Sequence, residues 1–206
     1  METTSPESAL IIVDLQNDFM PGGPLGVPGA DSLLPLIVGR LGGFSTVVAT
    51  QDWHPPGHGS FASQHPGAQP GELGELDGLP QVMWPDHCVA GTRGAELVDG
   101  LPLDRLTAVF RKGQDPRVDS YSGFFDNGRR GDTGLADWLR GRGVRRLVVV
   151  GVATDYCVQY TARDAATLGF EVELWLPGCR GVELQPGDVA RALDGLRSAG
   201  VEVTEA

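Results

Sequence analysis

Residues 146–169 read RLVVVGVATDYCVQYTARDAATLG and contain one complete strand-to-helix unit. The first five residues, 146–150, form the short, apolar, β-branched run that is typical of a buried parallel strand. Residues 155–168 then place small apolar side chains at helical spacing, and Gly169 follows where such a helix would end. The stretch therefore predicts a βα unit, the building block of a parallel α/β sheet.

The same alternation of strand and helix signals continues on both sides of this unit. Strands separated by helices predict a three-layer α/β/α fold around a mostly parallel, six-stranded sheet. No linker divides the chain, so we expect a single domain over residues 1–206. The remaining elements that we expect are strands at residues 8–13, 45–50, 107–111, 171–176 and 201–204, and helices at residues 32–41, 133–140 and 189–198.

The composition limits the classes of function. The formal net charge of −11 argues against nucleic acid or an anionic membrane surface as a partner, because both reward clustered Lys and Arg. No apolar run is long enough to cross a membrane, and the first residues lack the pattern of a signal peptide. Three cysteines do not make a disulfide framework. We therefore expect a cytoplasmic protein with reduced thiols.

Two long stretches, residues 51–91 and 112–132, lack helix or strand periodicity and are rich in Gly, Pro and aromatic residues. Each follows an expected strand, so each leaves the carboxyl edge of the sheet, where open α/β sheets bind ligands. Aromatic side chains on these stretches and on the segment after the first strand are expected to line a pocket for a planar, mostly apolar ligand. They are Phe19, Trp53, Trp84 and Tyr121.

Reactive side chains follow four successive strands of the expected sheet. Asp14, Asp52, Lys112 and Cys157 each come at or directly after a strand end, which brings them to one edge of the sheet. A carboxylate such as Asp14 can take a proton from a thiol and later give it to a leaving amine. A buried ammonium stabilises both the carboxylate and the thiolate. These residue types together favour nucleophilic catalysis by Cys157.

Cys157 lies where the helix after the fourth strand is expected to begin. Thr154 or Asp155 can cap that helix, which would place Cys157 in its first turn. Free N–H groups and the helix dipole in such a turn favour a thiolate, which lowers the pKa of the thiol, and can hold an oxyanion. Cys88 and Cys179 lack this placement and are expected to be structural.

All four histidines lie within residues 51–91. Asp52 and His54 can face the same way from an extended backbone, and His87 can close a three-ligand site. Two imidazoles and one carboxylate suit Zn²⁺ or a similar divalent ion and leave coordination positions open for water or substrate. His58 and His65 are expected to be exposed or to support the ligands from behind.

Six stretches of the chain resemble, in order, the motifs of the nicotinamidase/pyrazinamidase group of the isochorismatase-like cysteine hydrolases. Two of them, DWHPPGHGSFAS and WPDHCVAGTRGAEL, separate this group from relatives that share the triad but not the metal site. The stretches are VDLQNDFMPGGPLGV (13–27), DWHPPGHGSFAS (52–63), WPDHCVAGTRGAEL (84–97), FRKG (110–113), DSYSGFFD (119–126) and GVATDYCVQYTARDA (151–165).

The resemblance implies hydrolysis of nicotinamide to nicotinate and ammonia through a covalent thioester, in the salvage of NAD. It implies that Asp14, Lys112 and Cys157 are the catalytic triad. A cis peptide is implied before Ala153, and the N–H groups of Ala153 and Cys157 would form the oxyanion hole. Phe19, Trp84 and Tyr121 are the residues expected to form the substrate pocket.

The resemblance also implies one divalent metal ion that holds the pyridine nitrogen of the substrate. Its ligands would be Asp52, His54 and His87, and the ion would be Zn²⁺, with Fe²⁺ and Mn²⁺ as alternatives. Family members differ in the further side chain that completes the shell, so Ser60 and His58 both stay open. A homodimer or a larger homo-oligomer is compatible with the resemblance.

Three other functions compete with this reading. A related amidohydrolase acting on a ureido acid, maleamate or an N-carbamoyl compound would need an arginine or several polar donors in the pocket, for which Arg111 and Arg117 are the candidates. A non-catalytic metal-binding protein would have no use for an intact triad. A thiol redox protein would need a resolving cysteine near Cys157, and neither Cys88 nor Cys179 makes a C-x-x-C arrangement with it.

Overall fold

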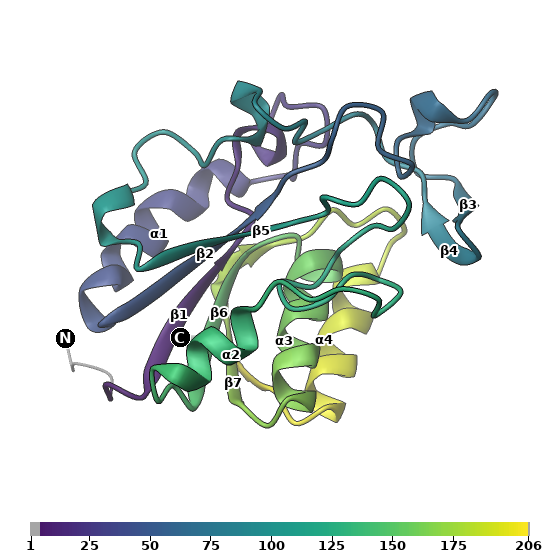
Figure 1. Ribbon diagram of the computed structural model, residues 1–206. Helices are drawn as coiled ribbons and strands as arrows, with labels where there is room; N and C mark the ends of the chain where they lie inside the picture. Colours follow the sequence, from purple (N-terminus) through teal and green to yellow (C-terminus); the bar gives the residue numbers. More distant parts are fainter. Residues whose placement is uncertain (1–4, 206) are drawn as a thin grey trace.

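A computed structural model, which describes residues 5–205, contains a parallel six-stranded sheet (Figure 1). The strand order is β5-β2-β1-β6-β7-β8, and every neighbouring pair is parallel. The predicted α/β class and six-stranded sheet are therefore confirmed. The bounds are β1 Ser8–Val13, β2 Thr46–Asp52, β5 Ala108–Lys112, β6 Arg146–Val152, β7 Glu171–Arg180 and β8 Glu202–Thr204.

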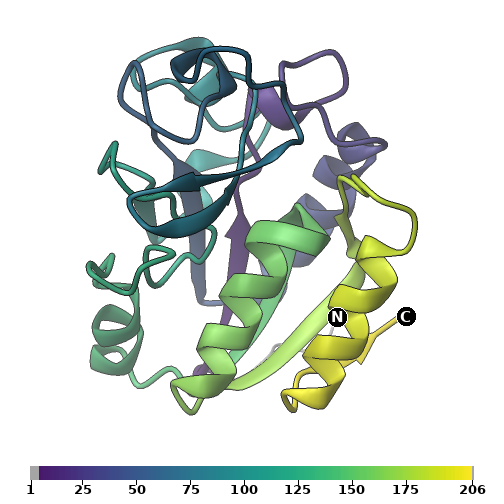
Figure 2. The same cartoon turned by 90° about the vertical axis from the view of Figure 1, so that its right-hand side faces the viewer.

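Helices cover both faces of this sheet and complete the three layers. Figure 1 shows α1 on one face and α2, α3 and α4 on the other, and Figure 2 shows α3 and α4 lying side by side. They span α1 Leu33–Arg40, α2 Leu135–Gly141, α3 Gln159–Thr167 and α4 Asp188–Ser198. Among residues 5–205, no helix is long and apolar enough to cross a membrane.

The central strand β1 shows why the sheet has a core on each side. All six of its residues are buried, and alternate side chains point to opposite faces. Ile11 packs among residues of α2, α3 and α4, whereas Leu10 and Ile12 pack among residues of α1. The continuous apolar run of the sequence is therefore a strand buried between two helical layers.

A two-stranded antiparallel hairpin was not expected from the sequence and lies within the long stretch 51–91. It pairs β3 Leu73–Leu76 with β4 Leu79–Val82. Asp77 and Gly78 form its turn, both with positive φ, which is the conformation that a tight hairpin turn requires. The Asp-Gly pair between apolar residues was the available signal.

The segment after β6 differs from the regular helix start that we expected. Residues Thr154–Val158 form a wider turn in which Tyr156 is non-helical, and the regular helix α3 begins only at Gln159. Neither Thr154 nor Asp155 caps it with a side-chain hydrogen bond. Cys157 therefore lies in an irregular turn before the helix, and not in the first turn of an α-helix.

Candidate active site

The four reactive side chains meet at the carboxyl ends of four strands, β1, β2, β5 and β6, which Figure 1 labels. Asp14 follows β1, and Cys157 lies in the turn after β6. Asp52 and Lys112 are the last residues of β2 and β5 and are register partners in the sheet. The topology therefore places two carboxylates, one ammonium and one thiol together.

The ammonium of Lys112 is the centre of this cluster. Its Nζ lies 2.9 Å from Asp14 Oδ2 and 3.2 Å from Asp52 Oδ1. The same atom donates to the carbonyl of Ser120 at 2.8 Å and to Cys157 Sγ at 3.5 Å. Lys112 is 2% exposed and is the only lysine in the chain. One buried positive charge thus holds both carboxylates and the thiol in register.

The carboxylate of Asp14 is fixed from its other side by Thr50. The Thr50 hydroxyl donates to Asp14 Oδ1 at 2.6 Å, and the backbone N–H of Asp14 donates back to the Thr50 hydroxyl at 3.2 Å. Asp14 is fully buried and has a positive φ of 49°. Its second oxygen is therefore left to face Lys112 and the thiol.

Burial has the largest effect on the pKa values of Cys157 and Asp14. It raises the pKa of the Cys157 thiol, and although Lys112 lowers it, the pKa stays well above 9.0. The expectation of a lowered thiol pKa was wrong for this arrangement, because the thiol is buried and no regular helix begins at it. Burial also raises the pKa of Asp14, which makes that carboxylate a better proton acceptor.

Opposite effects act on Lys112 and Asp52. Burial would lower the pKa of Lys112, but the adjacent Asp14 and Asp52 carboxylates raise it well above 10.5. Burial would raise the pKa of Asp52, but His54 and Lys112 hold it well below its usual range. Both groups are therefore charged at neutral pH.

Asp52, His54 and His87 form a buried group whose ligand atoms converge. His54 Nε2 lies 3.2 Å and His87 Nε2 lies 3.6 Å from Asp52 Oδ2. His54 Nδ1 bonds the carbonyl of Gly113 at 2.9 Å, and His87 Nδ1 bonds the carbonyl of Pro85 at 2.8 Å. A carbonyl only accepts, so each Nδ1 carries the proton and each Nε2 presents a lone pair to the same place.

This donor set fits a divalent metal ion. His54 Nε2 is buried and has no hydrogen-bond partner, which is costly unless a ligand satisfies it. A second group, His54 with His58 and Asp119, is also close enough to hold an ion. However, His58 bonds Ser60 Oγ through Nδ1 and the Asp115 carbonyl through Nε2, so neither of its ring nitrogens is free. The structure therefore favours the first group.

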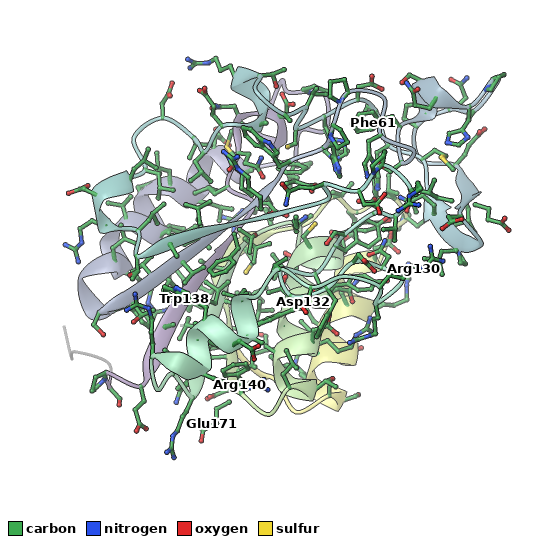
Figure 3. All side chains as sticks on the ribbon, in the orientation of Figure 1. Phe61, Arg130, Asp132, Trp138, Arg140 and Glu171 are labelled. Carbon is green, nitrogen blue, oxygen red and sulfur yellow. The ribbon has the colours of Figure 1, made fainter. Side chains whose placement is uncertain are left out.

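Ser60 and His58, the two candidates for completing the shell, bond each other at 2.8 Å. His58 is buried beside His54, with ring centroids 4.2 Å apart, so it supports a ligand from behind. Phe61 packs against three of the histidines: its ring centroid lies within 5.7 Å of those of His54, His58 and His87. Figure 3 places Phe61 in the loops at the opposite end of the molecule from Glu171, the first residue of β7.

A small cavity opens beside these groups. The three expected pocket residues, Phe19, Trp84 and Tyr121, all line it. Trp53 does not, because it lies outside the cavity with Arg111 over its ring, 3.8 Å from the centroid. The remaining lining residues are Leu25, Asp52, His87, Asp119, Ala153, Tyr156, Cys157 and Val182.

Sequence reasoning missed four of these: Leu25, Asp119, Tyr156 and Val182. Tyr156 and Asp119 were within recognisable motifs, whereas nothing in the sequence around Val182 indicated a pocket wall. Tyr156 packs its ring against Trp84, with centroids 4.9 Å apart. The Trp84 indole N–H donates to the Tyr121 hydroxyl at 3.1 Å, so the aromatic walls hold one another.

Neither arginine that could recognise an anionic substrate reaches the cavity. Arg111 stacks on Trp53 and donates to Gln51 at 3.1 Å. The Arg117 side chain is 78% exposed and pairs with Asp115. The cavity is instead lined by aromatic rings and the carboxylates of Asp52 and Asp119, which suits a planar, uncharged ligand.

The oxyanion-hole candidates also reach the cavity. Ala153 and Cys157 both line it, and the Val152–Ala153 peptide bond is cis, as the resemblance implied. Cys88 and Cys179 are buried in the two cores, in line with structural roles.

Known proteins resemble this chain over most of its length. Residues 8–206 match the family described as Isochorismatase domain. The chain is 52% identical over 200 residues to the nicotinamidase of Escherichia coli, covering 95% of this chain and 93% of the relative. A solved nicotinamidase/pyrazinamidase of Acinetobacter baumannii superposes with a TM-score of 0.95 at 42% identity, covering 98% of this chain and 97% of that one.

A second solved structure bears on the metal. The pyrazinamidase of Pyrococcus horikoshii in complex with zinc superposes with a TM-score of 0.78 at 41% identity. The match covers 98% of this chain and 100% of that one. A relative of the same fold therefore binds zinc, and this chain has a candidate Asp/His site for such an ion.

Proposed function

The chain belongs to the isochorismatase family, and we propose that, as a nicotinamidase, it hydrolyses nicotinamide to nicotinate and ammonia through a thioester on Cys157. One observation carries the proposal for the mechanism. A buried thiol, a base and a cation contact one another, and the thiol lines a cavity that holds aromatic rings and carboxylates but no arginine.

The chemistry follows from the position of the protons. The pKa of Cys157 is raised, so the resting group is the thiol, and attack requires a base that takes its proton as the sulfur approaches the carboxamide carbon. Asp14, whose pKa is also raised, is that base. Lys112 stays charged and stabilises the negative charge that moves from the carboxylate to the sulfur.

The later steps return the proton. Asp14 gives it to the leaving ammonia, so the C–N bond breaks as the C–S bond is kept. Water, deprotonated by the same carboxylate, then attacks the thioester and releases nicotinate and the thiol. Ala153 and Cys157 both line the cavity, and their N–H groups would stabilise the oxyanion in each half of the reaction.

The metal site supports substrate orientation. Asp52, His54 and His87 would hold one divalent ion, and Zn²⁺ suits two imidazoles and one carboxylate. Such an ion supplies a Lewis-acidic anchor for the pyridine nitrogen. The chain's own part is to fix both imidazole tautomers and to stack the ring of the substrate between Phe19, Trp84 and Tyr121.

A panel of amides tests the proposed function against the related amidohydrolases. Ammonia release is measured with nicotinamide, a ureido acid, maleamate and an N-carbamoyl amino acid at equal concentrations. We expect nicotinamide to be turned over at least about 10²-fold faster than the anionic amides, because the cavity offers them two carboxylates and no arginine. Faster turnover of any anionic amide would contradict the proposal.

A further inference from the structure

Asp155 is a buried carboxylate to which the mechanism above gives no role. It is 4% exposed and lies two residues before Cys157. It does not cap a helix but joins two segments of chain: the backbone N–H of Val182 donates to its Oδ1 at 2.9 Å and that of Glu183 to its Oδ2 at 2.7 Å. Charge-assisted hydrogen bonds of this kind are about twice as strong as neutral ones.

The segment that Asp155 holds is a wall of the substrate cavity. Residues 181–183 follow the end of β7 at Arg180, and Val182 lines the cavity. The lack of a side chain at Gly181 lets this segment lie close to Asp155 and α4, since a Cβ there would lie 3.1 Å from Asp155 Oδ1 and 2.2 Å from Val189 Cγ2. Each backbone amide has one hydrogen to donate, so the N–H groups of both Val182 and Glu183 are used in hydrogen bonds to Asp155.

The nucleophile is held by contacts that do not involve the Asp155 side chain. The backbone N–H groups of Tyr156 and Val158 both donate to the carbonyl of Ala153 at 3.0 Å. Cys157 Sγ faces Lys112 Nζ at 3.5 Å. Loss of the Asp155 carboxylate should therefore loosen the wall while the reacting thiol keeps its place.

We propose that Asp155 is a positioning residue that sets the width of the substrate cavity by holding Val182, and so determines which ring sizes fit. The inference rests on the proposed function, because ring selectivity is measured on carboxamide hydrolysis. Asp155 contacts no reacting atom and acts only through Val182.

The test is the Asp155→Asn variant, which keeps the size of the side chain but points an amide N–H₂ at one of the two backbone donors. KM and kcat are measured with nicotinamide and with quinoline-3-carboxamide, which is nicotinamide enlarged by a fused ring. We expect KM for nicotinamide to rise about fivefold to tenfold, while kcat stays within about twofold of the parent. The kcat/KM ratio of the larger to the smaller amide should rise about tenfold.

Two further variants sharpen the test. Val182→Ala shortens the wall side chain and so widens the cavity directly. It should also raise the kcat/KM ratio of the larger to the smaller amide. Asp164→Asn is the matched control, since Asp164 is another buried carboxylate, 6% exposed, that lies on α3 and pairs with Arg129. It does not line the cavity, and KM and the ratio should not change.

An unchanged ratio in Asp155→Asn would overturn the inference, as would a large loss of kcat at unchanged ratio, which would mean that Asp155 holds the nucleophile instead. If Asp155→Asn does not fold, an unchanged ratio in Val182→Ala overturns it equally. Failure of the parent protein to hydrolyse nicotinamide would contradict the proposed function, and is thus distinguished from failure of this inference.

Discussion

At the scale of single residues, Lys112 carries the positive charge on which the site depends. Two buried carboxylates lie within 3.2 Å of its Nζ. Without the ammonium, these carboxylates would repel each other, and the Cys157 thiol would lose the positive charge beside it. Removing one member of such a buried set costs about 3–5 kcal/mol, because the remaining charges stay unpaired. The residue is therefore both structural and reactive.

The chain's only lysine allows a direct measurement of this charge. Because Asp14 and Asp52 raise the pKa of Lys112 well above 10.5, against the effect of burial, the ammonium should persist where an ordinary lysine loses its proton. Nitrogen NMR of protein labelled with ¹⁵N only in the lysine side chain should show a single Nζ signal. We expect that signal to keep its ammonium shift at pH 10.5. A midpoint of titration at or below pH 10.5 would contradict the ion pairs described here.

The candidate site residues were predictable because they lie in short motifs whose residue types indicate their chemistry. Asp14, Asp52, Lys112 and Cys157 each mark a strand end, and strand ends of a parallel sheet meet. The environment of Cys157 was not predictable, because its burial depends on loops far away in the chain. Val182 was missed for the same reason: its place in the cavity depends on hydrogen bonds to Asp155 across 27 residues.

At the scale of elements, the contact between β1 and β6 is closer than a side chain would allow. Gly151 has a φ of +120°, and a Cβ there would lie 2.1 Å from the carbonyl oxygen of Val13, its register partner. That contact sets the distance between the strand ends from which Asp14 and the Cys157 turn emerge. The glycine is required by both the backbone conformation and the space.

Gly151→Ala should therefore destabilise the protein by at least about 3 kcal/mol. Gly195→Ala is the matched control, since Gly195 lies in α4 with no atom near the position of a Cβ. It should raise the free energy of unfolding by about 0.5–1 kcal/mol, because alanine favours the helix. Urea unfolding of both variants checks this. Equal stability of the two would show that β1 and β6 do not approach as described.

Strand and helix positions were the most predictable feature at this scale. The apolar runs at residues 8–13 and 146–150 became β1 and most of β6, because a strand buried on both faces must be apolar throughout. The hairpin of β3 and β4 was missed because each strand has only four residues, too few for a clear alternation.

At the scale of the whole molecule, the candidate metal site joins the loops to the sheet. Asp52 ends a central strand, whereas His54 and His87 lie on the long loop segment. Asp14, Asp52 and Asp119 are buried carboxylates and Lys112 is one buried ammonium, so a divalent cation would balance their charge. Binding to the folded state alone stabilises it by mass action.

Removal of the metal should therefore be visible without any assay of activity. We expect purified protein to contain about one divalent ion per chain by elemental analysis, and chelation followed by dialysis to lower Tm by several degrees. Adding Zn²⁺ should restore the original Tm in the parent but not in His87→Ala, which lacks one ligand. An unchanged Tm after complete removal would contradict a metal site that joins loop and sheet.

The proposed mechanism requires Cys157 as the nucleophile, and replacing its thiol tests that role. Nicotinate formation from nicotinamide is followed for the parent, for Cys157→Ala, and for Cys179→Ala, which removes another buried cysteine that does not line the cavity. We expect the Cys179 variant to retain parental turnover within about threefold and the Cys157 variant to lose at least about 10⁴-fold. Nicotinate formation by Cys157→Ala at a rate near that of the parent would contradict the account.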